Sequence, residues 1–286
     1  MGGFSSVKEY ADSILAGKFR YSTWRKAPSQ ANTVGVWFDL SMSAGNPAAQ
    51  YYIGQQNTAT ALSLSTDGGL YHGGSVAPAT KFLSNLTALA TAATGLPMPM
   101  ILCDYLLFYP FIDEGTTDEQ FLINSATLPR YTDGAGVQVM AVSVGSRTGG
   151  QSFFIKYTNS NGVSGRVSRT VTQNTTSING SLVTTARATA GASTPFIPLQ
   201  EGDTGVRSIE SITMLGADVG LFTLVLVKPI LQTQIRGIDA PVEVSCYLDK
   251  GILPEIKNDA YLNFVCLPQG ALNATFLHGD ITFTWN

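Results

Sequence analysis

The sequence predicts a mainly β protein, with an antiparallel sandwich or jelly-roll-like body, an N-terminal helix and one further helix near 79–94. Three observations support this fold class. Many short segments are rich in β-branched and aromatic residues, and turns containing Gly, Pro or Asn separate them. The regular alternation of strands and helices that marks a parallel α/β fold is missing.

Two segments have the apolar periodicity of helices. Residues 6–16 begin at Ser6 with an acidic residue three positions later, which is capping-box spacing, and Gly17 follows as a stop. Residues 79–94 carry an apolar stripe at helical spacing that ends at a glycine. We therefore expect one helix in each segment.

Most of the remaining chain has the pattern of strands and loops. The dipeptide Asn161-Gly162 supplies the two positive-φ residues of a tight hairpin turn. A buried strand is typically apolar on both faces, as the stretch 100–109 is apart from Asp104. The expected strands are 34–40, 100–109, 137–144, 151–157, 165–171, 208–215, 221–227, 242–248, 261–267 and 280–285.

We divide the chain into an N-terminal helix and arm, residues 1–33, and a β-rich body, residues 34–286. The body is long enough for one large domain or for two packed sandwiches divided near 172–194. That segment is rich in Thr, Ser, Asn and Ala and has a single charge, Arg187. Such a composition favours a long exposed loop, or an arm that another subunit orders.

The chain is poor in charge. Its 286 residues hold 17 Lys+Arg and 20 Asp+Glu, or 13%, whereas soluble domains carry roughly 25%. The net charge of −3 argues against a dedicated nucleic-acid binder. No run of 18 apolar residues predicts a membrane span, and the start lacks the basic-then-apolar pattern of a signal peptide. Large assembly interfaces are depleted in charge, so this composition favours repeated packing against other subunits.

Motifs for catalysis are weak. The tripeptide Asp203-Thr204-Gly205 matches the active-site tripeptide of aspartic proteases, but such enzymes need two carboxylates and the chain has one copy. A polar turn is the favoured interpretation. His72 and His278 each precede a glycine, in a predicted loop and a predicted turn, and structural or surface roles are favoured for both. We expect no enzyme activity and no catalytic residue.

Motifs for metal or cofactor binding are equally weak. The densest acidic group could hold a Ca²⁺ ion at a subunit contact, although a solvated loop is favoured; it consists of Asp113, Glu114, Asp118 and Glu119. An odd number of distant cysteines implies no disulfide framework and fits a reducing cytoplasm; they are Cys103, Cys246 and Cys266. We expect no metal and no cofactor. Burial in a core or an interface is the favoured role for the three tryptophans, Trp24, Trp37 and Trp285.

A set of short segments is spread over nearly the whole chain: Ser5-Ser6-Val7, Leu15-Ala16-Gly17-Lys18, Trp37-Phe38-Asp39-Leu40, Ala44-Gly45-Asn46-Pro47, Leu102-Cys103-Asp104, Leu128-Pro129-Arg130-Tyr131-Thr132-Asp133-Gly134, Tyr157-Thr158-Asn159 with Gly162 and Gly165-Arg166, Phe196-Ile197-Pro198-Leu199, Gly202-Asp203-Thr204-Gly205, Leu224-Val225-Leu226-Val227-Lys228-Pro229 and Asp259-Ala260-Tyr261-Leu262. Together these segments resemble a group of structural proteins encoded by tailed bacteriophages, commonly among the head genes. The resemblance is patchy.

The resemblance implies a non-enzymatic virion component, assembled in the host cytoplasm, that binds and stabilises the capsid shell as a cement, decoration or minor capsid protein. Its expected partners are the major capsid protein or other virion proteins, and further copies of itself. A membrane or a specific nucleic acid is not expected. The alternative is a tail-associated or receptor-binding protein that recognises host glycans, because one fold can serve both roles. A capsid-forming protein and a polysaccharide-degrading enzyme rank lower.

Overall fold

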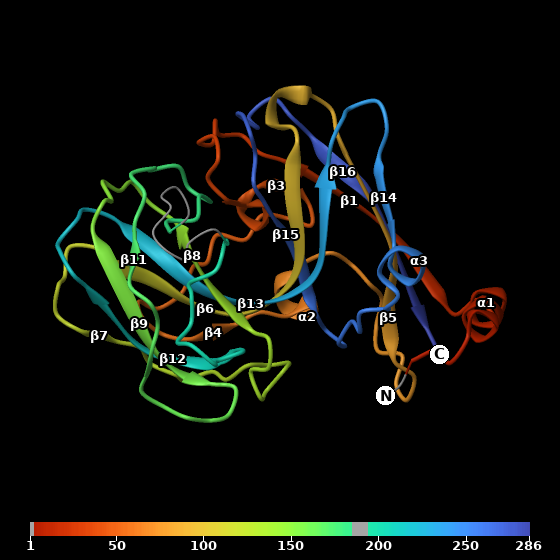
Figure 1. The fold of residues 1–286 in the computed structure, drawn as a ribbon, viewed down its shortest axis with the longest axis horizontal. Coiled ribbons are helices and arrows are strands. Elements are labelled where there is room, and N and C mark those ends of the chain that lie inside the picture. Colours follow the sequence, from red (N-terminus) through yellow and green to blue (C-terminus); the bar gives the residue numbers. More distant parts are fainter. Residues whose placement is uncertain (1–2, 185–193) are drawn as a thin grey trace.

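The computed structural model describes residues 3–184 and 194–286 and confirms a mainly β fold with antiparallel strand pairing (Figure 1). Sheet 1 has the order β14 (Val242–Ser245), β5 (Lys81–Ala90), β16 (Leu277–Trp285), β1 (Phe19–Ala27), β3 (Ala44–Asn46). Sheet 2 has the order β2 (Phe38–Asp39), β15 (Tyr261–Cys266), β6 (Met98–Asp113), β13 (Leu221–Ile235), β8 (Gln138–Ser143), with β4 (Thr60–Ala61) beside β6. Sheet 3 has the order β10 (Arg166–Val167), β9 (Ser152–Asn159), β12 (Val206–Met214), β7 (Gln120–Phe121), with β11 (Val171–Thr172) beside β9.

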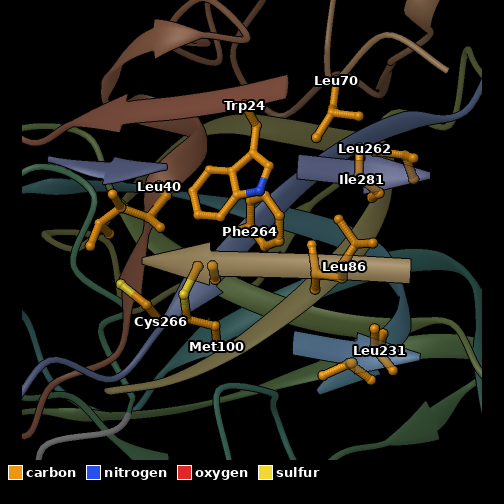
Figure 2. Close-up of a cluster of buried hydrophobic side chains, with 14 of the residues drawn as sticks. Trp24, Leu40, Leu70, Leu86, Met100, Leu231, Leu262, Phe264, Cys266 and Ile281 are labelled. Carbon is orange, nitrogen blue, oxygen red and sulfur yellow. The ribbon is translucent and has the colours of Figure 1, made fainter. Parts of the chain in front are cut away.

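Sheet 2 lies at the centre because the other two sheets pack against different ends of it. One hydrophobic cluster joins sheet 1 to one end of sheet 2, and Figure 2 shows Trp24 of β1 beside Phe264 of β15 within it. A second cluster joins sheet 3 to the other end. Along β6, Leu102 belongs to the first cluster and Cys103 to a third, because successive strand residues point to opposite faces. The chain is therefore organised around two long central strands, β6 and β13.

The helices are short, and the N-terminal one matches its prediction. Helix α1 (Val7–Leu15) begins after Ser6, whose side chain accepts a hydrogen bond from the Glu9 backbone N–H, and Gly17 follows its C-cap at φ 75°. The other helical segments are α2 (Leu64–Asp67), α3 (Cys246–Lys250) and the 3₁₀ turns η1 (Leu40–Met42) and η2 (Ala93–Gly95).

The helix predicted near 79–94 is wrong, because these residues form strand β5 in sheet 1. Leu86, Ala88 and Ala90 face the core while the residues between them point outward, which is the period of a strand. A shift in register where β5 pairs with β16 brings Leu83 into the same core. The spacing of the apolar residues fits both a helix and a strand. Pairing with β14 and β16 selects the strand.

Two segments expected to form an arm or an exposed loop are integral to the sheets. Residues 19–27, placed in the N-terminal arm, form β1 between β16 and β3. Residues 172–184 are mostly buried, and Ser181 and Leu182 bridge β2 and β8, the two edge strands of sheet 2. The sheet thus closes on itself through this stretch, which corrects the expectation of an exposed loop. The other part of the predicted division, residues 185–193, lies outside the described residues.

Candidate interaction surface and buried polar groups

Some of the charged side chains are buried inside the protein. Among the described residues, seven charged side chains are buried: Lys26, Asp39, Lys81, Asp104, Glu114, Arg130 and Arg147. Six of them form ion pairs or donate to backbone carbonyls. The seventh, Asp39, accepts hydrogen bonds from the hydroxyls of Ser41, Tyr52 and Tyr105. At most 30 of the 37 charged residues therefore remain for the outer surface.

The ion pair of Asp104 with Arg130 lies on sheet 2 between the two outer clusters. Arg130 Nε and Nη2 donate to the two Asp104 carboxylate oxygens at 2.8 and 2.7 Å. The Tyr261 backbone N–H also donates to Asp104, and Arg130 donates further to the carbonyls of Leu62 and Tyr105. Burial raises the pKa of Asp104, and Arg130 opposes that shift. The contacts fix three segments around the middle of β6, which is a structural role.

The carboxylate of the protease-like tripeptide is also structural. Asp203 accepts hydrogen bonds from Arg166 Nε at 2.9 Å, Tyr157 Oη at 2.6 Å and Asn159 Nδ2 at 2.7 Å. The pKa of Asp203 is lowered to about 2, first by the hydrogen bond from Arg166. A carboxylate held ionised in this way does not share a proton with a second acid, as aspartic protease chemistry requires. This geometry agrees with the polar turn that the sequence favoured.

The acidic group near 113–119 is divided among different partners. Glu114 pairs with Arg147 Nε at 2.7 Å, and Glu119 pairs with Lys156 Nζ at 2.7 Å. In residues 3–184 and 194–286, no three His, Cys, Asp or Glu side chains are grouped so as to hold a metal ion. The three cysteines are buried and unpaired. None of the helices in that same part of the chain is long and apolar enough to cross a membrane.

The two histidines occupy different environments. His72 is fully buried, where Lys81 Nζ lies 3.0 Å from its Nδ1 and the Ala260 carbonyl lies 3.0 Å from its Nε2. These contacts assign His72 as neutral, with the proton on Nε2. His278 lies at the start of β16 opposite Arg25, and it is half-buried. Neither histidine has a serine or cysteine nucleophile as its hydrogen-bond partner in the described chain.

The burial of His72 predicts a loss of stability in acid. Its pKa is lowered to about 4, first by burial and then by the charge of Lys81. As pH falls from 6.5 to 4, the unfolded chain takes up a proton at this position that the folded chain does not, so stability decreases. The full effect is on the order of 3 kcal/mol. Urea unfolding at pH 7 and pH 4 measures it.

The control for this prediction is His72→Gln, because glutamine offers one donor and one acceptor but does not titrate. The variant should lose less stability than the wild type between the two pH values. An identical pH dependence in both proteins would show that His72 is not responsible.

The strongest candidate for an interaction site is an apolar surface at one end of the molecule. Figure 1 shows α1, α3 and both chain ends on this side. The Tyr10 and Tyr247 rings stack at a centroid distance of 5.8 Å, which holds α1 against α3. Large apolar side chains remain exposed on and beside the two helices, and we call them the terminal helix surface: Val7, Leu15, Phe19, Leu248 and Ile252.

Exposure on this surface is high. Leu15 is 85% exposed and Leu248 is 79% exposed, although leucine is among the residues most often buried. Of α1 itself only Ser13 is buried. Exposed apolar groups that gather at one place mark sites of protein–protein contact. The sequence missed α3, because residues 242–248 have the pattern of a continuous strand, whereas Cys246–Lys250 form a helix.

No protein-family model matches the chain, and no curated protein matches it. Among solved structures, one of infectious bursal disease virus, Gt strain, is similar at a TM-score of 0.18 and 8% sequence identity. The match covers 93% of this chain and 80% of that chain. A likeness of this size does not establish a shared fold.

Proposed function

We propose that the protein is a non-enzymatic structural component of a tailed-phage virion that binds and stabilises the capsid shell as a cement, decoration or minor capsid protein. The observation that carries the proposal is the terminal helix surface, which leaves Leu15 and Leu248 exposed to solvent. The low charge content of the chain, 13%, supports it, because large assembly interfaces are depleted in charged residues. The resemblance of the sequence to phage head proteins points the same way.

The proposed partner of the terminal helix surface is the major capsid protein. Further copies of this chain are a second partner, since virion proteins sit at symmetry positions and form closed assemblies. Contacts of this kind need apolar side chains at the centre and polar groups around them. The exposed apolar residues of α1 and α3 meet the first requirement.

Immunogold labelling of purified virions tests the location. We expect label over the head. Label confined to the tail tip would support the receptor-binding alternative. Absence of the protein from virions by mass spectrometry would contradict a structural role altogether.

Charge placed on the terminal helix surface should weaken shell binding. In the double variant Leu15→Asp/Leu248→Asp, we expect the amount that co-sediments with heads lacking this protein to fall at least tenfold, since burying each leucine contributes about 1.5–3 kcal/mol. The thermal midpoint should stay close to that of the wild type, because both side chains are exposed.

The matched control is Leu215→Asp. Leu215 is 57% exposed and directly follows β12 of sheet 3, which lies away from α1 and α3 (Figure 1). It should bind like the wild type, and equal loss in both variants would contradict the assignment of the surface. A truncation must stop before Phe19, because β1 pairs with β16 from Phe19 to Lys26. Removal of residues 1–16 is therefore the appropriate deletion, with the same expected loss of binding.

A further inference from the structure

A second candidate for binding lies in the glycine-rich loop that follows α2. Residues 68–75 border a cavity of about 490 Å³, within the size range of small-molecule sites. Gly73 and Gly74 form part of its wall, Tyr71 stands at its rim with 55% of its surface exposed, and Asp259 lies among the other lining residues. None of these residues belongs to the terminal helix surface.

A buried lysine fixes the direction of the loop's peptide groups. Lys81 Nζ donates to the carbonyls of Gly73 at 3.2 Å and Gly74 at 2.9 Å, and its third contact is His72. Lys81 is 2% exposed and does not line the cavity. The peptide bonds after Gly73 and Gly74 are trans, so each N–H points away from the carbonyl of the same peptide.

The N–H groups of Gly74 and Ser75 therefore point away from Lys81. Neither has an acceptor in the part of the chain that the structure describes. Two successive N–H groups that point to one side form a concave site for an anion. Because the lysine holds the carbonyls, this arrangement exists before any ligand binds.

An arginine lies next to the cavity, against Tyr71 and Gly73 of its wall, although it is not one of the lining residues. The Arg20 guanidinium lies 5.3 Å from the centre of the Tyr71 ring, and a Cβ at Gly73 would lie 3.3 Å from Arg20 Nε. Gly73 has φ +84°, so both its conformation and this contact favour glycine. Among residues 3–184 and 194–286, Arg20 has no acidic partner. Its charge is thus available to a ligand.

We propose that this cavity, together with Arg20 at its border, binds an acidic saccharide, with a sugar carboxylate held by Arg20 and the N–H groups of Gly74 and Ser75. Arginine matches the planar geometry of a carboxylate. The exposed Tyr71 ring offers a flat apolar face to the sugar ring. The carboxylate of Asp259, which already accepts from Ser65 N and Oγ, can accept from sugar hydroxyls on the opposite wall.

Titration calorimetry on the purified full-length protein tests the proposal with four probes. They are trigalacturonic acid and 3′-sialyllactose as acidic saccharides, lactose as a neutral saccharide and acetate as a bare carboxylate. We expect at least one acidic saccharide to bind. Lactose and acetate should bind at least tenfold more weakly, because lactose lacks the carboxylate and acetate lacks the sugar ring. Since the purified protein is used, the result does not depend on where the protein sits in a virion.

Variants assign the binding to this cavity. Arg20→Gln and Tyr71→Ala should each weaken the acidic saccharide about tenfold or more, since each removes a contact to a charged group or a ring. The matched control is Arg25→Gln, because Arg25 lies on the same strand but over the Phe276 ring, 4.2 Å from its centre.

Three results would overturn the proposal. The first is a dissociation constant weaker than about 10 mM for both acidic saccharides. The second is equal binding of acetate or lactose, which would indicate a bare anion site or a neutral sugar site. The third is an equal effect of Arg20→Gln and Arg25→Gln, which would show that net charge rather than this cavity governs binding.

Discussion

Replacing Arg130 with methionine should lower the free energy of unfolding by about 3–5 kcal/mol. Arg130 holds the Asp104 carboxylate through two hydrogen bonds of 2.8 and 2.7 Å, and Asp104 is fully buried on sheet 2. Without the guanidinium, the carboxylate must stay charged without a partner or take up a proton. The carbonyls of Leu62 and Tyr105 lose a donor as well.

Urea unfolding followed by circular dichroism measures this change. The double variant Arg130→Met/Asp104→Leu should recover part of the loss, because removing both charges leaves no uncompensated ion. Lys8→Met is the matched control, since it breaks the solvent-exposed pair of Lys8 with Asp12 and should cost less than about 1 kcal/mol. A loss in Arg130→Met no larger than in Lys8→Met would contradict the prediction.

Replacing Trp24 with alanine should also cost about 3–5 kcal/mol. The indole is 1% exposed between sheets 1 and 2, and its ring centre lies 4.4 Å from that of Phe264 (Figure 2). The Nε1–H donates to the Thr87 carbonyl at 3.2 Å. Alanine would leave a cavity in the first hydrophobic cluster and an unpaired carbonyl beside it.

The comparison for Trp24→Ala is Trp285→Ala, which removes a tryptophan of the same sheet that is only half-buried. Both free energies of unfolding can be measured by urea titration under the same conditions. We expect the Trp285 variant to lose clearly less than the Trp24 variant. Equal losses would mean that the cluster around Trp24 relaxes to fill the space.

The local pattern of the sequence was sufficient for most strands of the body. The run of apolar residues at 100–109 and the β-branched run at 137–144 correspond to β6 and β8, because a buried strand needs apolar side chains on both faces. Helix α1 could be predicted because its cap and stop lie within the sequence itself. The start and end of long strands were less predictable, as β13 continues to Ile235 past a proline.

Three features depended on partners distant in the sequence. The apolar spacing of residues 81–90 fits both a helix and a strand, and pairing with the neighbouring strands β14 and β16 makes this segment a strand. Residues 172–184 lack the composition of a core segment, yet Ser181 and Leu182 close sheet 2. The loop at 68–75 gave no sign in the sequence that Lys81 holds it or that Arg20 stands beside it.

The mainly β class, the N-terminal helix and the scarcity of charge could all be predicted, because they follow from residue type and local spacing. The tertiary arrangement places the charges, because an ion pair such as Asp104 with Arg130 joins residues from separate segments. It also decided which apolar residues stay exposed, as on α1 and α3. Burial depends on the packing of all three sheets, which no local pattern encodes.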